Sequence, residues 1–372
     1  MNMYKERVVR PTRKSFLLLA VALFCVAACN SAGLPKPAAP IQDANVLGSA
    51  PYRIDIPENW NGDLVVLLHG YEPKGSPRQQ PWPQNEAAPL FLAKGYAVAA
   101  SGYSSQGWAV ADAVADTERL RTYFVEKYRK PRHAYLVGFS MGGLAALKSA
   151  ELHGTSYDGA LSLCGANMPA ATVFQDAVLT PLVAFDYFFP GTMGLATGGL
   201  ADPDSPAMLD SEAIERQLQK NEPIATLLSK RLDIPRPGLA GALMLYNLVL
   251  REAASRAGGF PVDNRSVAYS GFGDDEAFNR GVRRYAGDPR AVASIGGSAE
   301  LTGNIRTPVV LQPSALDPTV PARFNGFYPQ LVRSRGTPQP LLELPAVGEG
   351  HCGFANEQIE GAFDRLLQLH RR

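Results

Sequence analysis

The feature that most constrains the fold is a serine set between glycines, where a strand-like run meets a helix-like run. Residues 134–139 (AYLVGF) have the composition of a buried strand, and residues 144–152 that of a helix. Between them, Gly138, Ser140 and Gly142 fit the pattern G-x-S-x-G. A serine on such a turn projects its hydroxyl above the carboxyl end of a sheet, beside a helix N-terminus. A glycine-rich turn that only packs a helix on a strand is the simpler alternative.

The rest of the chain predicts that strands alternate with helices. The expected strands are residues 52–57, 64–68, 96–100, 158–164, 307–312 and 341–347, and the expected helices include residues 112–127 and 359–369. Continuous apolar strands between helices are typical of a mostly parallel sheet covered on both faces, so we expect an α/β fold. Residues 166–304, rich in helix formers, break this alternation. They predict a helical cap inserted into a core made of residues 49–165 and 305–372.

The composition fits one large globular domain with an insertion. The chain has 372 residues, of which 46% are hydrophobic. Its formal net charge is +1, without a block of like charge after the first few residues. We therefore do not expect nucleic acid as a partner.

The first 29 residues have the composition of a signal peptide and are set apart from the fold. Five basic residues precede an apolar run at residues 16–28, which is too short to span a bilayer comfortably. The run ends in VAAC, with small residues just before Cys29. Residues 30–48, which begin with a Pro- and Ala-rich stretch, are expected to be a linker.

The VAAC ending resembles the lipobox of bacterial lipoproteins. In that family the cysteine is acylated and becomes the new N-terminus, which implies a membrane anchor at Cys29. Asn30 stands where such lipoproteins carry aspartate when they stay at the inner membrane, so the resemblance implies an anchor at the outer membrane of the cell envelope. An ordinary signal peptide, and with it a periplasmic or secreted protein, is the alternative.

A serine hydroxyl needs a base and an orienting carboxylate to act as a nucleophile. His351 lies in a flexible loop directly after the last predicted strand and is the expected base. Asp317 follows the strand at residues 307–312 and is the expected carboxylate. Asp274 and Asp275 lie inside the cap without a strand to position them, and Glu349 is too close to His351 in sequence to orient it easily.

Two backbone amides are expected to hold a developing oxyanion. One is the amide of Met141, directly after the serine. The other is the amide of Tyr71, in the loop after the strand at residues 64–68, where His69 and Gly70 let the chain turn tightly. A simple strand-ending turn is the alternative for these two residues.

In order and position, these motifs resemble the α/β-hydrolase family. They are HG at 69–70, GFSMGG at 138–143, LDPTVP at 316–321 and GEGHCGF at 348–354. The resemblance covers residues 50–165 and 305–370, and the cap stands where that family commonly carries a lid. It implies the α/β-hydrolase fold and acyl transfer by Ser140, His351 and Asp317.

A segment at residues 56–62 (IPENWNG) also resembles tannase and feruloyl-esterase-like hydrolases. In that group a disulfide ties the residue before the serine to the residue after the histidine. Here Phe139 precedes Ser140, so that bridge cannot form. Cys164 ends the neighbouring strand, and we predict a Cys164–Cys352 disulfide in its place. Two separate buried thiols are the alternative.

We therefore predict a serine esterase acting on small-molecule esters. The chemistry requires no metal or cofactor, and the sequence shows no ligand-like cluster for one. A serine peptidase or amidase would use the same three residues and differ only in the cap and pocket. A non-catalytic envelope lipoprotein that keeps the fold as a binding module is the second alternative.

Overall fold

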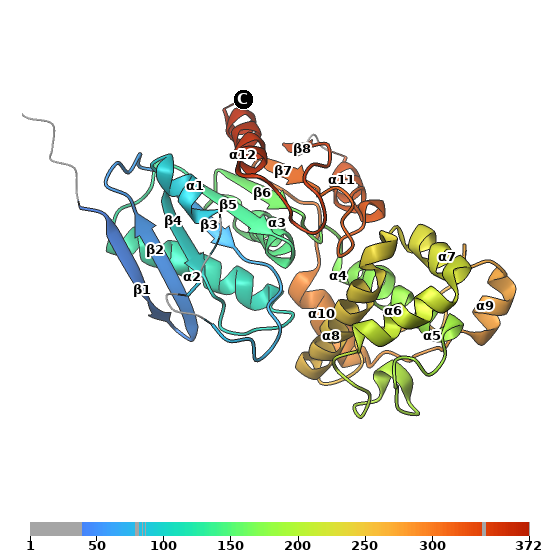
Figure 1. Cartoon of the computed structure of the whole chain (residues 1–372). Coiled ribbons are helices and arrows are strands. Elements are labelled where there is room, and N and C mark those ends of the chain that lie inside the picture. Colours follow the sequence, from blue (N-terminus) through green and yellow to red (C-terminus); the bar gives the residue numbers. More distant parts are fainter. Residues whose placement is uncertain (1–38, 79–81, 84, 86, 337–339, 372) are drawn as a thin grey trace, which may run out of the picture. The chain divides into compact units, whose positions relative to one another are not determined.

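The computed structural model describes residues 39–78, 82–83, 85, 87–336 and 340–371. Its strands are β1 (Ile41–Leu47), β2 (Ala50–Ile56), β3 (Leu64–Leu68), β4 (Ala97–Ser101), β5 (Ala134–Phe139), β6 (Gly159–Leu163), β7 (Val309–Gln312) and β8 (Leu341–Glu343). They form an eight-stranded sheet in the order β1-β2-β4-β3-β5-β6-β7-β8 (Figure 1). The pairs β1–β2 and β2–β4 are antiparallel and the others are parallel. The predicted mostly parallel α/β sheet is confirmed.

The central strands are apolar because both of their faces are covered. Every residue of β3, β4 and β6 is buried. On one face α2 (Val110–Lys127) and α3 (Met141–His153) pack against the sheet. On the other face α1 (Ala88–Ala93) and α12 (Asn356–His370) meet through Phe91 and Phe363, whose ring centroids are 5.0 Å apart. The sheet is thus the middle of three layers.

Strand β1 corrects the predicted linker at residues 30–48. Residues 41–47 pair along their whole length with β2, and the chain reverses at Gly48, whose φ of +65° suits a glycine. Most of β1 is exposed on both faces. An edge strand of this kind shows no apolar alternation, so the sequence pattern did not indicate it.

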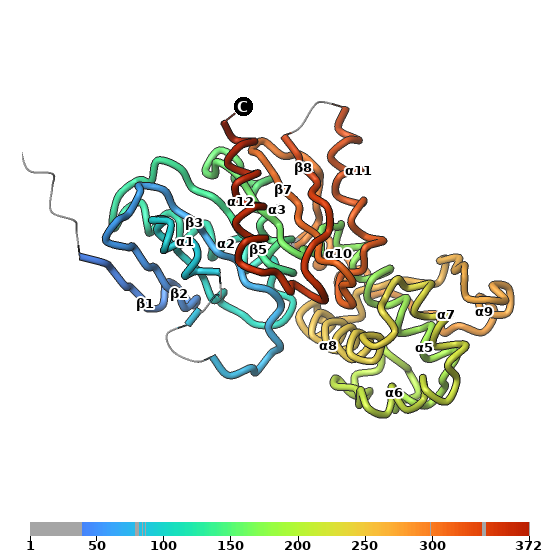
Figure 2. The backbone as a smooth tube through the Cα atoms, turned by 45° about the horizontal axis from the view of Figure 1, so that its top comes forward, coloured from blue at the N-terminus to red at the C-terminus, as the bar shows by residue number. Residues whose placement is uncertain are grey.

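The chain leaves the sheet after β6 and returns at β7, although these two strands are neighbours. The described elements between them are all helical (Figure 2). They are α4 (Ala170–Thr172), a π-helical segment η1 (Val173–Leu179), α5 (Thr180–Phe188), a 3₁₀ turn η2 (Gly199–Ala201), α6 (Ser211–Lys220), α7 (Glu222–Leu232), a 3₁₀ turn η3 (Arg236–Gly238), α8 (Leu239–Ala257), α9 (Asp275–Gly281) and α10 (Pro289–Ala299). We call residues 166–304 the cap segment. Between β7 and β8 lie a 3₁₀ turn η4 (Ala322–Phe324) and α11 (Phe327–Arg333).

The predicted signal peptide at residues 1–29, with Cys29, lies outside the described residues, as does the predicted linker up to residue 38. Among the helices that the structure describes, none is both long and apolar enough to cross a membrane.

Candidate active site

Ser140 occupies a sharp turn between β5 and α3. Its backbone has φ 55° and ψ −122°, a conformation that residues other than glycine rarely adopt. A Cβ added at Gly138 would lie 2.1 Å from the carbonyl oxygen of Gly142, and one added at Gly142 would lie 2.2 Å from that of Leu68. Both glycines are therefore required by the close approach of α3 to the strands, and the packed backbone maintains the strained turn at the serine.

The three residues expected to act together lie within hydrogen-bonding distance of one another. The Ser140 Oγ is 2.8 Å from the His351 Nε2. The His351 Nδ1 is 2.9 Å from the Asp317 Oδ2 and 3.0 Å from the Oδ1. A carboxylate at Nδ1 favours the tautomer in which Nε2 can accept the proton of the serine hydroxyl.

The Asp317 carboxylate is held in place by backbone hydrogen bonds in addition to its contact with His351. It lies in the loop after β7, and only 4% of its surface is exposed. Its Oδ1 accepts the backbone amides of Thr319 at 2.8 Å and Val320 at 3.0 Å. These bonds hold the carboxylate plane, so the orientation of the His351 ring is set by the β7 loop.

The loop after β3 crosses directly above the serine. A Cβ added at Gly70 would lie 3.2 Å from the Ser140 Cβ, so a larger residue would press on the serine. The amide of Met141 begins α3 and has no acceptor within the helix. Among the described residues, neither this amide nor that of Tyr71 has a hydrogen-bond acceptor. Both predicted donors are therefore free to bind an oxygen atom.

Cys164 and Cys352 are placed as a disulfide pair, with Cα atoms 5.3 Å apart. Cys164 follows β6, and its amide donates to the carbonyl oxygen of Gln312 at the end of β7. Cys352 follows His351 directly. The bridge therefore connects the histidine loop to the carboxyl edge of the sheet.

A cavity of about 330 Å³ opens at Ser140. Its walls are mostly apolar and come from the core and the cap segment. They include Met168, Val173, Ala177 and Val178 before α5, and Leu245, Tyr246 and Val249 on α8. None of the residues that line it carries a carboxylate. The cavity suits an apolar group next to the serine hydroxyl.

Helix α8 is bonded to both loops of the site. The Tyr246 hydroxyl donates to the carbonyl oxygens of Pro318 and Thr319, beside Asp317, at 3.0 Å each. The Tyr71 hydroxyl donates to the Glu252 carboxylate at 2.5 Å. Burial and this carboxylate raise the pKa of Tyr71 well above its usual value. The phenol therefore stays protonated as the donor.

Tyr246 and Glu252 were missed by the sequence analysis. With Leu245 and Val249 they follow a helical period, which could have shown that they share a face of one helix. Nothing in the sequence indicated that this face meets residues 71 and 318. Of the other candidates, Asp274 caps α9 by accepting the amide of Ala277, and Glu349 is exposed.

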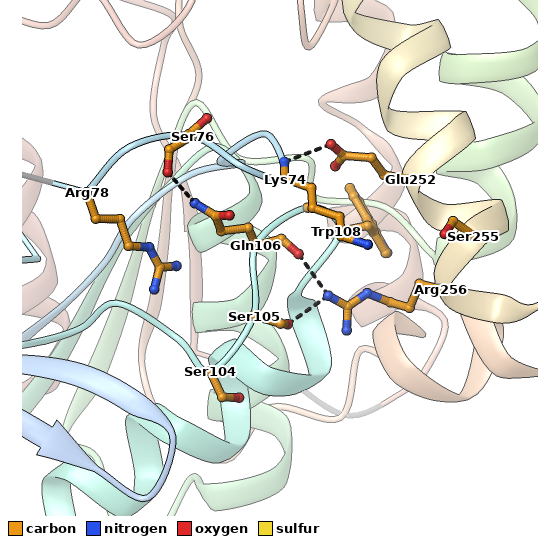
Figure 3. A pocket seen from close by; sticks show the side chains of 11 residues that line it. Lys74, Ser76, Arg78, Ser104, Ser105, Gln106, Trp108, Glu252, Ser255 and Arg256 are labelled. Carbon is orange, nitrogen blue, oxygen red and sulfur yellow. Dashed lines mark hydrogen bonds between the residues drawn. The ribbon is translucent and has the colours of Figure 1, made fainter. Parts of the chain in front are cut away.

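A second, polar cavity of about 650 Å³ lies next to the first and shares Trp108 with it. Figure 3 shows the Glu252 carboxylate accepting a hydrogen bond from the backbone amide of Lys74. The Arg256 guanidinium donates to the Ser105 hydroxyl and to the backbone carbonyl oxygen of Gln106. Most charged groups here are paired, since Arg256 also binds Asp112 and Arg78 binds Glu72. Serine hydroxyls and an amide complete the lining. This cavity suits a polar group that forms hydrogen bonds.

His69 does not line the cavity at Ser140. Its Nδ1 donates to the carbonyl oxygen of Gly70 at 2.8 Å, and its ring stacks on Tyr103 with centroids 4.0 Å apart. Burial lowers the pKa of His69 below its usual value, so the ring is neutral at pH 7. It supports the loop after β3 rather than the chemistry.

Comparison with known proteins gives a family and several structures of similar fold. An esterase of Pyrococcus furiosus is 14% identical, with a TM-score of 0.46 and coverage of 90% of this chain and 91% of that chain. A proline iminopeptidase of Mycobacterium smegmatis is 14% identical (TM-score 0.42; 89% and 98% covered), and E-2-(acetamidomethylene)succinate hydrolase is 15% identical (TM-score 0.42; 89% and 100% covered). The search of curated proteins gave no match. The model of the "Alpha/beta hydrolase family" matches residues 65–365. Since this match spans most of the sheet and the cap segment, the chain belongs to the alpha/beta hydrolase family.

Proposed function

We propose that this protein is a serine hydrolase that cleaves carboxylic esters through an acyl-enzyme. The observation that carries the proposal is the alignment of the Ser140 hydroxyl, the His351 ring and the Asp317 carboxylate at one mouth of an apolar cavity. Tyr71 and Met141, whose backbone amides have no acceptor among the described residues, line the same cavity as Ser140. A nucleophile, a base, an orienting carboxylate and an oxyanion site are the parts that acyl transfer needs.

The reaction begins when the Ser140 Oγ attacks the ester carbonyl carbon. The His351 Nε2 takes the hydroxyl proton, and Asp317 stabilises the resulting imidazolium. The carbonyl oxygen becomes an oxyanion held by the amides of Tyr71 and Met141. When the tetrahedral intermediate collapses, the ester C–O bond breaks and His351 gives its proton to the leaving alcohol. Water, with His351 again as base, then releases the acid and restores the Ser140 hydroxyl.

The two cavities support an ester with one apolar and one polar half. The apolar cavity at Ser140 is suited to an acyl chain, because Val173, Val178 and Val249 line it. The polar cavity, which shares Trp108 with the apolar one, is suited to an alcohol that carries further hydroxyl groups. A serine peptidase is the second candidate. Ester cleavage is favoured because no carboxylate lines the cavity at Ser140 to bind a peptide amine.

The decisive experiment compares the protein with Ser140→Ala on p-nitrophenyl esters from acetyl to long acyl chains, a monoacylglycerol and a peptide p-nitroanilide. We expect ester turnover that falls at least about 10³-fold in Ser140→Ala. Ser156→Ala, a serine in the turn after α3, is the matched control and should retain full activity.

Turnover of the anilide alone would replace the esterase with a peptidase. Ester turnover unchanged in Ser140→Ala would overturn the assignment of the nucleophile. A fluorophosphonate probe gives an independent readout, because it should label the peptide that contains Ser140 in the protein and in Ser156→Ala, but not in Ser140→Ala. Absence of labelling and of turnover in folded protein would favour the binding module.

We also propose that the chain is anchored to the cell envelope through a lipid on Cys29. The support is the VAAC sequence after a short apolar run. Expression in a bacterium, followed by detergent phase partitioning, tests this. The protein should enter the detergent phase and Cys29→Ser should enter the aqueous phase. Equal partitioning of the two into the aqueous phase would support an ordinary signal peptide.

A further inference from the structure

Two histidines without a role in the ester site meet a carboxylate at the opposite edge of the sheet. His133 precedes β5, Asp158 precedes β6, and His370 ends α12. One potential ligand atom from each of the three lies within 4.8 Å of the other two. The His133 Nδ1 is 3.2 Å and the His370 Nε2 is 3.9 Å from the same Asp158 Oδ1. The chain has five histidines, and these two, 237 positions apart in the sequence, meet at one carboxylate.

The backbone holds the carboxylate so that one oxygen faces the two rings. The Asp158 Oδ2 accepts the amide of Ala134 at 2.9 Å, and the Asp158 amide donates to the Ala134 carbonyl at 2.8 Å. The Oδ1 is thereby directed at the histidines. The His133 carbonyl oxygen in turn accepts the amide of Leu64 at 2.9 Å. Two members of the cluster are therefore fixed at the ends of paired strands.

An ion pair accounts for only part of this arrangement. The His133 Nδ1 is within hydrogen-bonding distance of Asp158, whereas the His370 side chain, whose Nε2 is 3.9 Å from the same carboxylate oxygen, forms no hydrogen bond with a described residue. Its ring instead lies edge-on to His133 and Tyr135, with centroids 5.1 and 6.0 Å away. All three side chains are partly exposed, at 42%, 31% and 27%, so an ion in solution can reach them.

We propose that His133, Asp158 and His370 form a binding site for a transition-metal ion of the zinc type, with water completing the coordination. Two imidazole nitrogens and one carboxylate oxygen are ligands typical of zinc, nickel, cobalt and copper rather than of magnesium or calcium. Around a tetrahedral zinc ion with bonds of about 2.0–2.1 Å, ligand atoms lie roughly 3.4 Å apart. The separations of 3.2 and 3.9 Å from Asp158 lie near this value, and one nitrogen of each ring lies within 4.8 Å of the other, so binding requires the side chains to draw together around the ion.

The site is separate from the ester chemistry. His133 and Ser140 stand at opposite ends of the six-residue strand β5, which at about 3.3 Å per residue places them roughly 20 Å apart. A metal ion here joins the end of α12 to the amino-terminal edge of β5 and β6. The expected effect is resistance to unfolding, with ester turnover unchanged.

The test uses the chain purified without a histidine tag and treated with chelator. Zinc chloride is titrated by calorimetry, and the unfolding temperature is measured with and without it. We expect a one-to-one complex and a higher unfolding temperature in zinc. His133→Ala and His370→Ala should each weaken binding at least about tenfold and remove the shift, since each removes a direct ligand. His153→Ala, which changes a histidine at the end of α3, is the matched control and should keep both.

Zinc binding that is the same in His133→Ala and His370→Ala as in the original chain would overturn the site. So would the absence of one-to-one binding by zinc, nickel and cobalt in protein that is folded. Ester turnover is recorded in parallel, and turnover that depends on added zinc would contradict the separation from Ser140.

Discussion

The Tyr71 hydroxyl and the Glu252 carboxylate, 181 residues apart in the chain, share a hydrogen bond of 2.5 Å. One belongs to the loop above Ser140 and the other to α8 of the cap segment. Glu252 also accepts the backbone amide of Lys74 at 2.8 Å. The position of the proposed oxyanion donor therefore depends on a helix inserted between two strands of the sheet.

Tyr71→Phe and Glu252→Gln are expected to lower kcat/KM for p-nitrophenyl butyrate by roughly tenfold, because each loosens the loop without removing its amide. The two changes together should cost little more than either one, since they break the same contact. Glu276→Gln on α9, whose side chain is 83% exposed, is the control and should have no effect. Full additivity in the double variant would show that the hydrogen bond does not couple the loop to the helix.

Asp317→Asn is expected to lower kcat by roughly 10³- to 10⁴-fold while the protein stays folded, because asparagine supports the wrong tautomer of His351. The amides of Thr319 and Val320 still find an acceptor in the asparagine oxygen. Kinetics with circular dichroism on the same preparation measure both effects. Asp275→Asn in the cap segment is the matched control, and activity retained in Asp317→Asn would point to a different carboxylate.

The Cys164–Cys352 pair spans 188 residues, so it constrains the unfolded chain strongly. Replacing both cysteines with alanine is expected to lower the free energy of unfolding by about 5 kcal/mol in the loop-entropy model. The change should also lower kcat, since the histidine loop loses its attachment to β6. Urea unfolding with and without reductant measures the first effect. The double variant should not respond to reductant, and an original chain that is equally insensitive would indicate two free thiols.

Val249→Phe is expected to reduce turnover of long-chain p-nitrophenyl esters by about tenfold or more and to spare the acetyl ester. The valine is buried on α8 and lines the cavity of about 330 Å³ at Ser140, so a larger ring shortens the space for an acyl chain. The ratio of kcat/KM values across the ester series is the measurement. Val292→Phe on α10, where the valine is 41% exposed, is the control. A uniform loss across chain lengths would mean that the acyl chain binds elsewhere.

The free energy of unfolding is expected to decrease as the pH falls below about 6.5, because burial lowers the pKa of His69 in the folded protein. The unfolded chain then binds a proton that the folded chain does not. One such proton corresponds to about 1.4 kcal/mol per pH unit. The contribution is fully present above pH 7.5 and is lost as the pH falls toward the folded pKa.

Urea unfolding at pH 5.0, 6.0 and 7.5 checks this slope. His69→Gln should remove the part of the slope that comes from this one proton. Carboxylates whose pKa is lowered, such as Glu118, lose their contribution only below about pH 4.5, outside this window. An equal slope in the original chain and in His69→Gln would assign the pH dependence to other groups.

The parts of the site that were predicted from the sequence are those whose position follows from a strand end. Ser140, Asp317 and His351 each follow a predicted strand of a parallel sheet. Because the carboxyl ends of parallel strands lie at the same edge, the three residues could be predicted to lie close together although they are far apart in the sequence. Gly138 and Gly142 could also be interpreted from the sequence, because a tight turn between a strand and a helix requires residues without a side chain. The α/β fold followed from apolar runs buried on both faces.

The parts that were missed depend on pairings that leave no pattern in the sequence. Strand β1 is exposed and reads as a linker, because only its backbone bonds to β2 define it. Tyr246 and Glu252 lie on a helix whose period is visible, but its direction toward Ser140 is set by the packing of the cap segment. His370 is near the end of the chain, and only the fold of α12 brings it to His133.

The adjacency of β6 and β7 has a consequence for how such a protein can change over generations. The strands are parallel neighbours, with Leu163 at the end of β6 paired with Gln312 at the end of β7, although the cap segment separates them in the sequence. The relative positions of Ser140 and Asp317 therefore depend first on the pairing of β5, β6 and β7, whose carboxyl ends they follow. Changes at residues 166–304 that keep the contacts of Tyr246 and Glu252 with the two loops can therefore reshape the walls of the cavity while Ser140 and Asp317 keep their places.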